Sequence, residues 1–125
     1  MDKKYLALND ISAYKKSFIL SNCIWGIVCS WGYFEKDTVG KQFVRAVDSI
    51  SANIAEGFGR YGKKDKIKFY YYSRGSVKES LDWNEKAKIR KLIKKEEYDK
   101  IYKCLNSLSK EINTLIQFTN NNLTI

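Results

Sequence analysis

Histidine and proline are both absent from this sequence of 125 residues, and cysteine occurs only three times. Without histidine, the chain has no imidazole to activate a nucleophile or to shuttle protons near neutral pH. No C-x-x-C pair is present to begin a zinc site. We therefore expect a protein that is not an enzyme and that holds no metal ion and no cofactor. The three cysteines lie in apolar runs and are expected to be buried, reduced thiols: Cys23, Cys29 and Cys104.

Long hydrophobic runs are also lacking. The most apolar stretch, residues 19–31, is interrupted by Ser21, Asn22 and Gly26. It is shorter than the roughly 20 apolar residues that cross a bilayer. Lysines precede this stretch, but it does not show the small-residue cleavage site of a secretion signal, so it does not resemble one. We expect a buried helix in a soluble, cytoplasmic protein that has no membrane partner.

Little in the chain interrupts helices, because glycine occurs only seven times and proline not at all. Apolar residues recur at spacings of three and four in four segments, which predicts helices at about 10–31, 38–58, 64–90 and 96–119. Gly32, with the two aromatic residues after it, is expected to end the first helix. Short connections favour antiparallel neighbours. The prediction is one all-α domain, an antiparallel up-and-down four-helix bundle.

The apolar stripe of each helix indicates which side chains face the core. In the first helix these are Ile11, Tyr14, Phe18, Ser21, Trp25 and Val28. In the second they are Val39, Phe43, Ala46, Ile50 and Ile54. In the fourth they are Tyr98, Ile101, Leu105, Leu108, Ile112 and Leu115.

Positive charge is concentrated in one third of the chain. Residues 60–95 contain 13 basic residues against 4 acidic ones, and this difference equals the whole net charge of +9. A block of this kind favours nucleic acid or an acidic protein surface as a partner. One candidate nucleic-acid-binding group is Arg60, Lys63, Lys64, Lys66, Lys68 and Arg74. A second, near the other end of the third helix, is Lys86, Lys88, Arg90, Lys91, Lys94 and Lys95.

Four aromatic residues follow one another in the third helix, at positions 69–72. Four neighbours spread over about 300° of a helix, so a single core face cannot hold them all. The candidates for an oligomer interface, or for stacking on unpaired bases, are Tyr70, Tyr71 and Tyr72. Ordinary, partly exposed tyrosine is the third interpretation. Nearby, the small residues Ser73, Gly75 and Ser76 would let another helix approach closely.

Catalytic and phosphate-binding patterns are incomplete. Gly57-Phe58-Gly59 is followed by neither a G-x-G-x-x-G pattern nor a P-loop, which predicts a junction between two helices. Asp82 and Glu85 share a helix face, but a two-metal bundle also needs Glu-x-x-His. Glu56 is more consistent with a hydrogen-bonding role than with that of a general base.

The sequence SISANIAEGFGR at residues 49–60, followed downstream by RGSVKES at 74–80, resembles a known family. This is the four-helix-bundle family of bacterial proteins encoded in 23S ribosomal RNA intervening sequences. The family includes the accessory variability protein of diversity-generating retroelements. The residues that carry the motif are Asn53, Glu56, Gly57, Arg74, Gly75 and Ser76, and their role is expected to be structural. The chain departs from the family at Ser51, where proline is usual.

The resemblance implies a ring-like homo-oligomer, a pentamer. For the retroelement branch it also implies binding of RNA or DNA and association with a reverse transcriptase. The clustered charge and surplus aromatic residues agree with it independently. Our first hypothesis is an oligomeric accessory protein that binds nucleic acid by charge, with weak sequence specificity. The alternative is a scaffold that binds an acidic protein and has no physiological nucleic-acid ligand.

Overall fold

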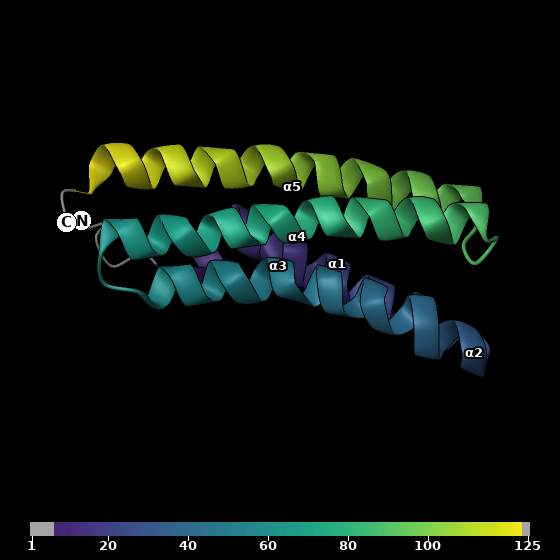
Figure 1. Ribbon diagram of the computed structural model, residues 1–125. Helices are drawn as coiled ribbons and strands as arrows, with labels where there is room; N and C mark the ends of the chain where they lie inside the picture. The colour runs from purple at the N-terminus through teal and green to yellow at the C-terminus, as the bar shows by residue number, and fades with distance from the viewer. Residues whose placement is uncertain (1–6, 124–125) are drawn as a thin grey trace.

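The structure, a computed structural model, describes residues 7–123. These residues form four long helices and no strand, which confirms the predicted all-α bundle (Figure 1). A 3-10 turn, η2, precedes the first helix, and two short segments, α2 and η3, precede the second long helix. The elements are η2 (Leu8–Asp10), α1 (Ser12–Cys29), α2 (Tyr33–Glu35), η3 (Lys36–Gly40), α3 (Lys41–Gly59), α4 (Lys63–Ile89) and α5 (Lys95–Asn122).

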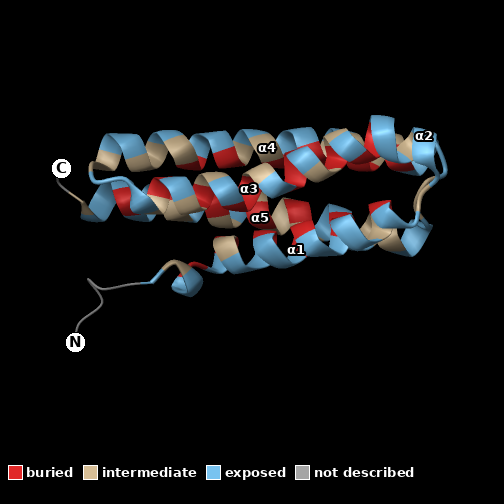
Figure 2. Ribbon diagram, turned by 90° about the horizontal axis from the view of Figure 1, so that it is seen from below, coloured by how far each residue is buried: buried red, intermediate tan, exposed pale blue. Residues whose placement is uncertain are grey.

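The long helices pack as a ring of four neighbours. α3 packs on α1 and α4, and α5 closes the bundle by packing on α4 and, less extensively, on α1. α1 and α4 are therefore diagonal to each other. The α4–α5 turn and α2 lie at one end of the bundle, and the α3–α4 turn lies at the other (Figures 1 and 2). We call the end formed by α2 and the α4–α5 turn the tip.

The second helical segment begins earlier than predicted. The backbone is helical without a break from Tyr33 to Gly59, and η3 is a π-helical turn within it. Gly32 does not end the preceding helix, because α1 stops at Cys29. Gly32 is instead the extended N-cap of α2, and its carbonyl accepts a hydrogen bond of 2.9 Å from the backbone N–H of Lys36. The aromatic pair after Gly32 thus opens a helix at the tip.

The core follows the predicted stripes of α3 and α5 closely (Figure 2). All five positions predicted for the second helix are buried, Val39 in η3 and the other four in α3, as are four of the six in α5. α5 continues its buried stripe through Ile116 and Thr119, whereas Tyr98 and Leu115 are half-buried. The side-chain periodicity of these two helices was sufficient to identify their inner faces.

The inner face of α1 is rotated slightly from the predicted one: Ile11, Ser21 and Val28 are buried as predicted, whereas Phe18 and Trp25 are not. Phe18 is 51% exposed and Trp25 is 60% exposed. The buried residues are smaller: Ala13, Ser17, Leu20, Ser21, Ile24 and Val28. The hydroxyls of Ser17 and Ser21 donate to backbone carbonyls three residues earlier, so both can be buried with their hydrogen bonds made.

α3 and α4 approach closely where the predicted motif lies. A Cβ on Gly57 would be 2.7 Å from Cε1 of Tyr70 and 3.0 Å from the Lys66 carbonyl oxygen. Ser73 is fully buried, and its hydroxyl donates to the Ile50 carbonyl of α3 at 2.7 Å. A small residue and one hydrogen bond across the interface therefore set the position of α4 against α3.

The cysteines differ from the prediction. Cys23 and Cys29 are exposed, and only Cys104 is partly buried. Burial raises the pKa of the Cys104 thiol, with a smaller contribution from nearby Cys23 and an opposing one from Lys16. The rotation of α1 is the reason, because it turns both of its cysteines outward. In residues 7–123, no helix is both long and apolar enough to cross a membrane.

Candidate nucleic-acid interface

The predicted basic residues form two separate groups on the surface, at opposite ends of α4. The junction cluster surrounds the α3–α4 turn and the first turns of α4: Arg60, Lys63, Lys64, Lys66, Lys68 and Arg74. The tip cluster surrounds the α4–α5 turn: Lys86, Lys88, Arg90, Lys91, Lys94 and Lys95. At about 1.5 Å per residue, α4 holds Lys63 and Arg90 roughly 40 Å apart, whereas Arg74, in the middle of the helix, is roughly 18 Å from Lys86.

Most of the junction cluster is engaged in contacts within the bundle. Lys66 donates to the Phe58 carbonyl at 2.8 Å and so satisfies the C-terminal end of α3. Its burial lowers the pKa of Lys66. Arg60 pairs with Glu56 at 2.8 Å and lies 4.6 Å from the ring centre of Phe69. The contacts of Lys66 and Arg60 therefore stabilise the junction between α3 and α4.

Three of the other junction residues follow the same trend, whereas Lys64 is exposed and has no ion pair within residues 7–123. Lys68 is 3.7 Å from Asp65, and Lys63 donates to the Asn120 carbonyl at 3.3 Å. Arg74, in the middle of α4, donates to Asn113 of α5 at 2.6 Å and lies over the ring of Tyr71. Arg74 therefore lies apart from the others along the helix and fastens α4 to α5.

The tip cluster has two ion pairs, as the junction cluster does, but its other cations are more exposed. Lys86 pairs with Asp82 at 2.6 Å, and Lys95 pairs with Asp99 at 3.0 Å. Within residues 7–123, the remaining four cations have no carboxylate oxygen within 4.0 Å, and all are exposed: Lys88, Arg90, Lys91 and Lys94. Lys88 lies 4.3 Å from the ring centre of Tyr98, a contact that positions it and leaves its charge in place.

Lys91 has a left-handed backbone, with φ of 60°. The N–H of Leu92 donates to the Ala87 carbonyl at 2.8 Å, and that of Lys91 donates to the Lys88 carbonyl at 3.0 Å. This is a Schellman motif, in which the left-handed position is usually glycine. A residue with a Cβ costs about 1–2 kcal/mol in this conformation. A lysine is thus held at the centre of the tip cluster at the expense of stability.

The three consecutive tyrosines of α4 point in different directions, so one is buried and two are partly exposed. Tyr70 is only 2% exposed, and its burial raises its pKa to about 12. Tyr70 is therefore part of the core, and the prediction that it contacts a partner was wrong. Tyr71 and Tyr72 are about half exposed, and Tyr71 is covered by the guanidinium of Arg74.

The motif residues have structural contacts. Asn53 donates to the Ser49 carbonyl at 2.9 Å, and Ser76 donates to the Tyr72 carbonyl at 3.2 Å. Gly57 makes the close contact with α4 described above. Gly75 differs from the expectation of tight packing, because a Cβ there would meet nothing within 4 Å. Within its own bundle, Gly75 has no packing role.

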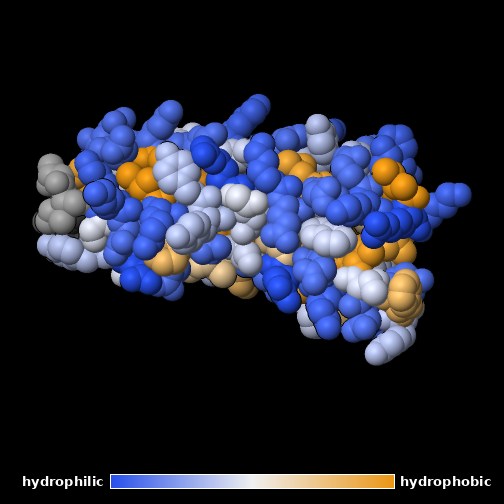
Figure 3. Space-filling model, viewed as in Figure 1, coloured by the Kyte–Doolittle hydropathy of each residue, from blue (hydrophilic) through white to orange (hydrophobic). Residues whose placement is uncertain are grey.

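Sequence reasoning missed two aromatic side chains at the tip. Tyr33 is 82% exposed and Phe34 is 71% exposed, and Ile89 at the end of α4 is 75% exposed. Figure 3 shows hydrophobic residues at this end of the molecule, bordered by hydrophilic ones. A groove of about 400 Å³ is lined by Phe34, Glu35, Thr38, Val39, Arg90 and Leu92. The missed signal was the helix start at Gly32, which places the aromatic pair beside the tip cluster.

These features define a class of protein, a four-helix bundle with basic clusters at both ends and exposed aromatic rings beside one of them. The chain belongs to the 23S rRNA-intervening sequence protein family, whose model matches residues 9–114. It is similar to the crystal structure of a protein of unknown function from the S23 ribosomal protein family of Bacteroides thetaiotaomicron VPI-5482. The TM-score is 0.75 at 22% identity, covering 83% of this chain and 97% of that one, which supports the fold. The search of curated proteins found no match.

Proposed function

We propose that this chain is a non-enzymatic accessory protein that binds nucleic acid through its basic surface, chiefly through the tip cluster. The observation that carries the proposal is Lys91, a charged residue kept in a left-handed position that favours glycine. Backbone strain of this kind is characteristic of functional positions. Its exposed neighbours Lys88, Arg90 and Lys94 supply further positive charge for phosphate contacts.

Charge, and not base recognition, is the expected source of affinity. Each phosphate contact contributes about 0.7 to 0.9 to the slope of log affinity against log salt concentration. Four contacts at the tip therefore give a slope near −3. Because phosphate contacts carry no sequence information, we expect RNA and DNA to bind with weak sequence preference.

The test is fluorescence anisotropy with RNA and DNA across a salt series, comparing the native chain with Lys91→Gly. Lys91→Gly should reduce the slope by about one contact, 0.7 to 0.9. It should also raise the free energy of unfolding by about 1 kcal/mol, because glycine relieves the left-handed strain. The matched control is Lys78→Ala, which removes an exposed α4 charge outside both clusters. Absence of binding by the native chain at about 50 mM salt would end the proposal.

A second candidate is a scaffold that binds protein partners, and it is favoured by the exposed apolar residues of α1. Phe18 and Trp25 project from the helix diagonal to α4 and away from its basic residues. The motif's resemblance to retroelement accessory proteins makes a reverse transcriptase one such partner. A complex that survives nuclease treatment, together with undetectable binding to free nucleic acid, would favour this candidate over the first.

A further inference from the structure

The tip brings together two segments that are far apart in sequence. Phe34 opens the second helical segment, Arg90 ends α4, and both line the same groove. Tyr33 lies next to Phe34 and is even more exposed. The bundle therefore presents aromatic rings directly beside four exposed cations that have no carboxylate partner among the described residues: Lys88, Arg90, Lys91 and Lys94.

Phe34 is held on a regular backbone. Its segment continues into α3 without a break, and the hydroxyl of Thr38 donates to the Phe34 carbonyl at 2.7 Å. Below the ring, the groove is closed by Val39, which is buried, and by Leu92, which is half-buried. An exposed ring with a fixed backbone loses little conformational entropy when a flat ligand stacks on it.

Two carboxylates lie near the groove, and one of them, that of Glu35, belongs to a residue that lines it. Asp37 lies 3.4 Å from Lys41. The Glu35 carboxylate bends back toward the start of its own helix, 2.7 Å from where a Cβ on Gly32 would lie. Neither neutralises Arg90 or the turn that follows it. The lining of the groove thus combines the Phe34 ring with an Arg90 side chain that the nearby Glu35 does not pair with.

This combination fits an unpaired base better than a duplex or a membrane. Bases in a duplex are already stacked, so their faces are not available to a side chain. A membrane-bound surface needs a broad apolar face, usually along a helix lying in the interface. At the tip, Ile89 is the one large aliphatic residue among those that are mostly exposed, and the cations lie on a turn.

We propose that the tip binds single-stranded nucleic acid, with one base stacked on Phe34 and the adjoining phosphates held by Arg90, Lys91 and Lys94. This rests on the nucleic-acid function proposed above and assigns it to unpaired strands. Tyr33 offers a second ring for the neighbouring base. The groove at the junction end is lined by Lys63, Lys64, Ile67 and Asn120, and neither an aromatic ring nor an arginine lines it.

The experiment measures the affinity of Phe34 variants for a short fluorescein-labelled single strand and for a duplex of the same length. Phe34→Ala should weaken single-strand binding about 5- to 100-fold, the range found when one stacking residue is removed, and leave duplex binding nearly unchanged. Phe34→Leu should behave like Phe34→Ala, because it keeps an apolar side chain but has no π-face. Phe34→Trp should retain single-strand affinity. Since Phe34 is 71% exposed, these variants are expected to fold, which circular dichroism verifies.

The matched control is Tyr61→Ala, which removes a ring of similar exposure, 81%, at the opposite end of the bundle. It should have little effect on the single strand. Native affinity in Phe34→Leu would overturn stacking, and an equal loss in Tyr61→Ala would overturn its assignment to the tip. Binding to anionic vesicles that depends on Phe34 and is not displaced by oligonucleotide would assign the surface to a membrane instead. If the native chain binds no strand at low salt, the proposed function itself fails, which is a separate result.

Discussion

Two glycines of the predicted motif behave in opposite ways at the residue scale. Gly57 lies where α3 meets α4, and the Tyr70 ring occupies the space that a side chain would need. Gly75 lies on the exposed side of α4 with open space around it. Both are helical, so both pay the same conformational cost relative to alanine, about 0.5–1 kcal/mol. The space around an added Cβ therefore decides whether alanine destabilises or stabilises the bundle at each position.

Gly57→Ala should therefore destabilise the bundle by about 1–3 kcal/mol, the usual cost of overpacking a core. Gly75→Ala should stabilise it by about 0.5–1 kcal/mol, because alanine favours the helix and meets no neighbour. Chemical denaturation of both variants measures these changes, and the shared substitution makes each the control for the other. Equal shifts in the same direction would show that α3 and α4 do not approach as described.

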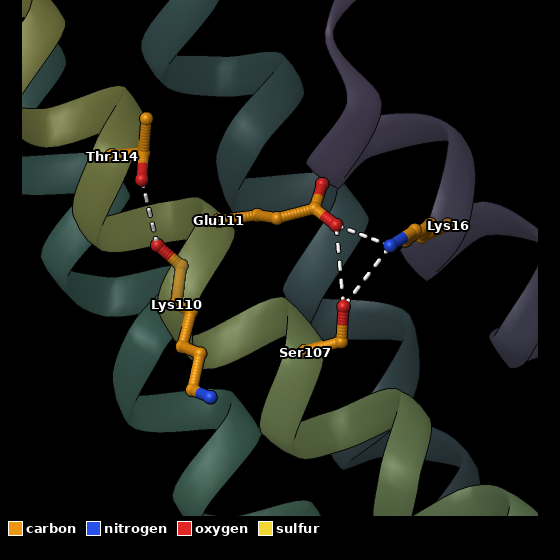
Figure 4. A network of polar contacts seen from close by, with 5 residues as sticks. All are labelled: Lys16, Ser107, Lys110, Glu111 and Thr114. Carbon is orange, nitrogen blue, oxygen red and sulfur yellow. Dashed lines mark hydrogen bonds and ion pairs between the residues drawn. The ribbon is translucent and has the colours of Figure 1, made fainter.

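At the element scale, α1 and α5 share the less extensive interface and are linked by a polar network (Figure 4). Lys16 of α1 bonds to Glu111 and donates to Ser107 of α5 at 3.0 Å. Ser107 in turn donates to Glu111 at 3.2 Å. Burial alone would raise the pKa of Glu111, but hydrogen bonds from Lys16, Ser12 and Ser107 outweigh it and hold that pKa below its ordinary value of 4.5.

The lowered pKa of Glu111 determines the sign of a pH effect. A carboxylate whose pKa is lower in the folded state contributes stability above its unfolded pKa and loses it as pH falls through the folded value. Glu111→Gln should therefore lower the denaturation midpoint at neutral pH, and the difference from the native chain should shrink below about pH 4.5. Glu96→Gln, an exposed change at the start of α5, is the control. A difference that stays constant down to pH 3 would exclude this linkage.

Elements differed in how well their sequences specified them. α3 and α5 each have one clear apolar stripe, so their inner faces could be predicted. α1 is apolar on several sides, with Ile19, Phe18 and Trp25 exposed in addition to its buried face. Its orientation depends on the small side chains that let it approach its neighbours, and periodicity does not reveal that preference. The two basic clusters could be located from the sequence, but which of their cations are neutralised depends on side chains from other turns and helices.

At the scale of the whole molecule, a second exposed apolar surface lies on α1, apart from the excess of positive charge. Helix α4 and the turn after it carry the excess of positive charge, while Phe18, Ile19 and Trp25 project from α1, which is diagonal to α4. Tyr71 and Tyr72 were the predicted interface residues, but they lie among basic side chains, where bringing copies together would also bring like charges together. α1 is the better surface for a second copy, because association through it leaves the tip cluster free.

Association through α1 predicts a mass in light scattering that is a multiple of 14.6 kDa, five-fold if the ring implied by the family resemblance forms. Trp25→Glu should return the mass to about that of one chain, because it places a charge in the apolar surface that two copies would bury. Since Trp25 is 60% exposed, the substitution should leave the bundle itself folded. Tyr61→Glu adds the same charge at the junction end and should leave the mass unchanged. A native mass near 14.6 kDa would contradict the oligomer, while loss of assembly in Tyr61→Glu alone would move the interface from α1 to the junction.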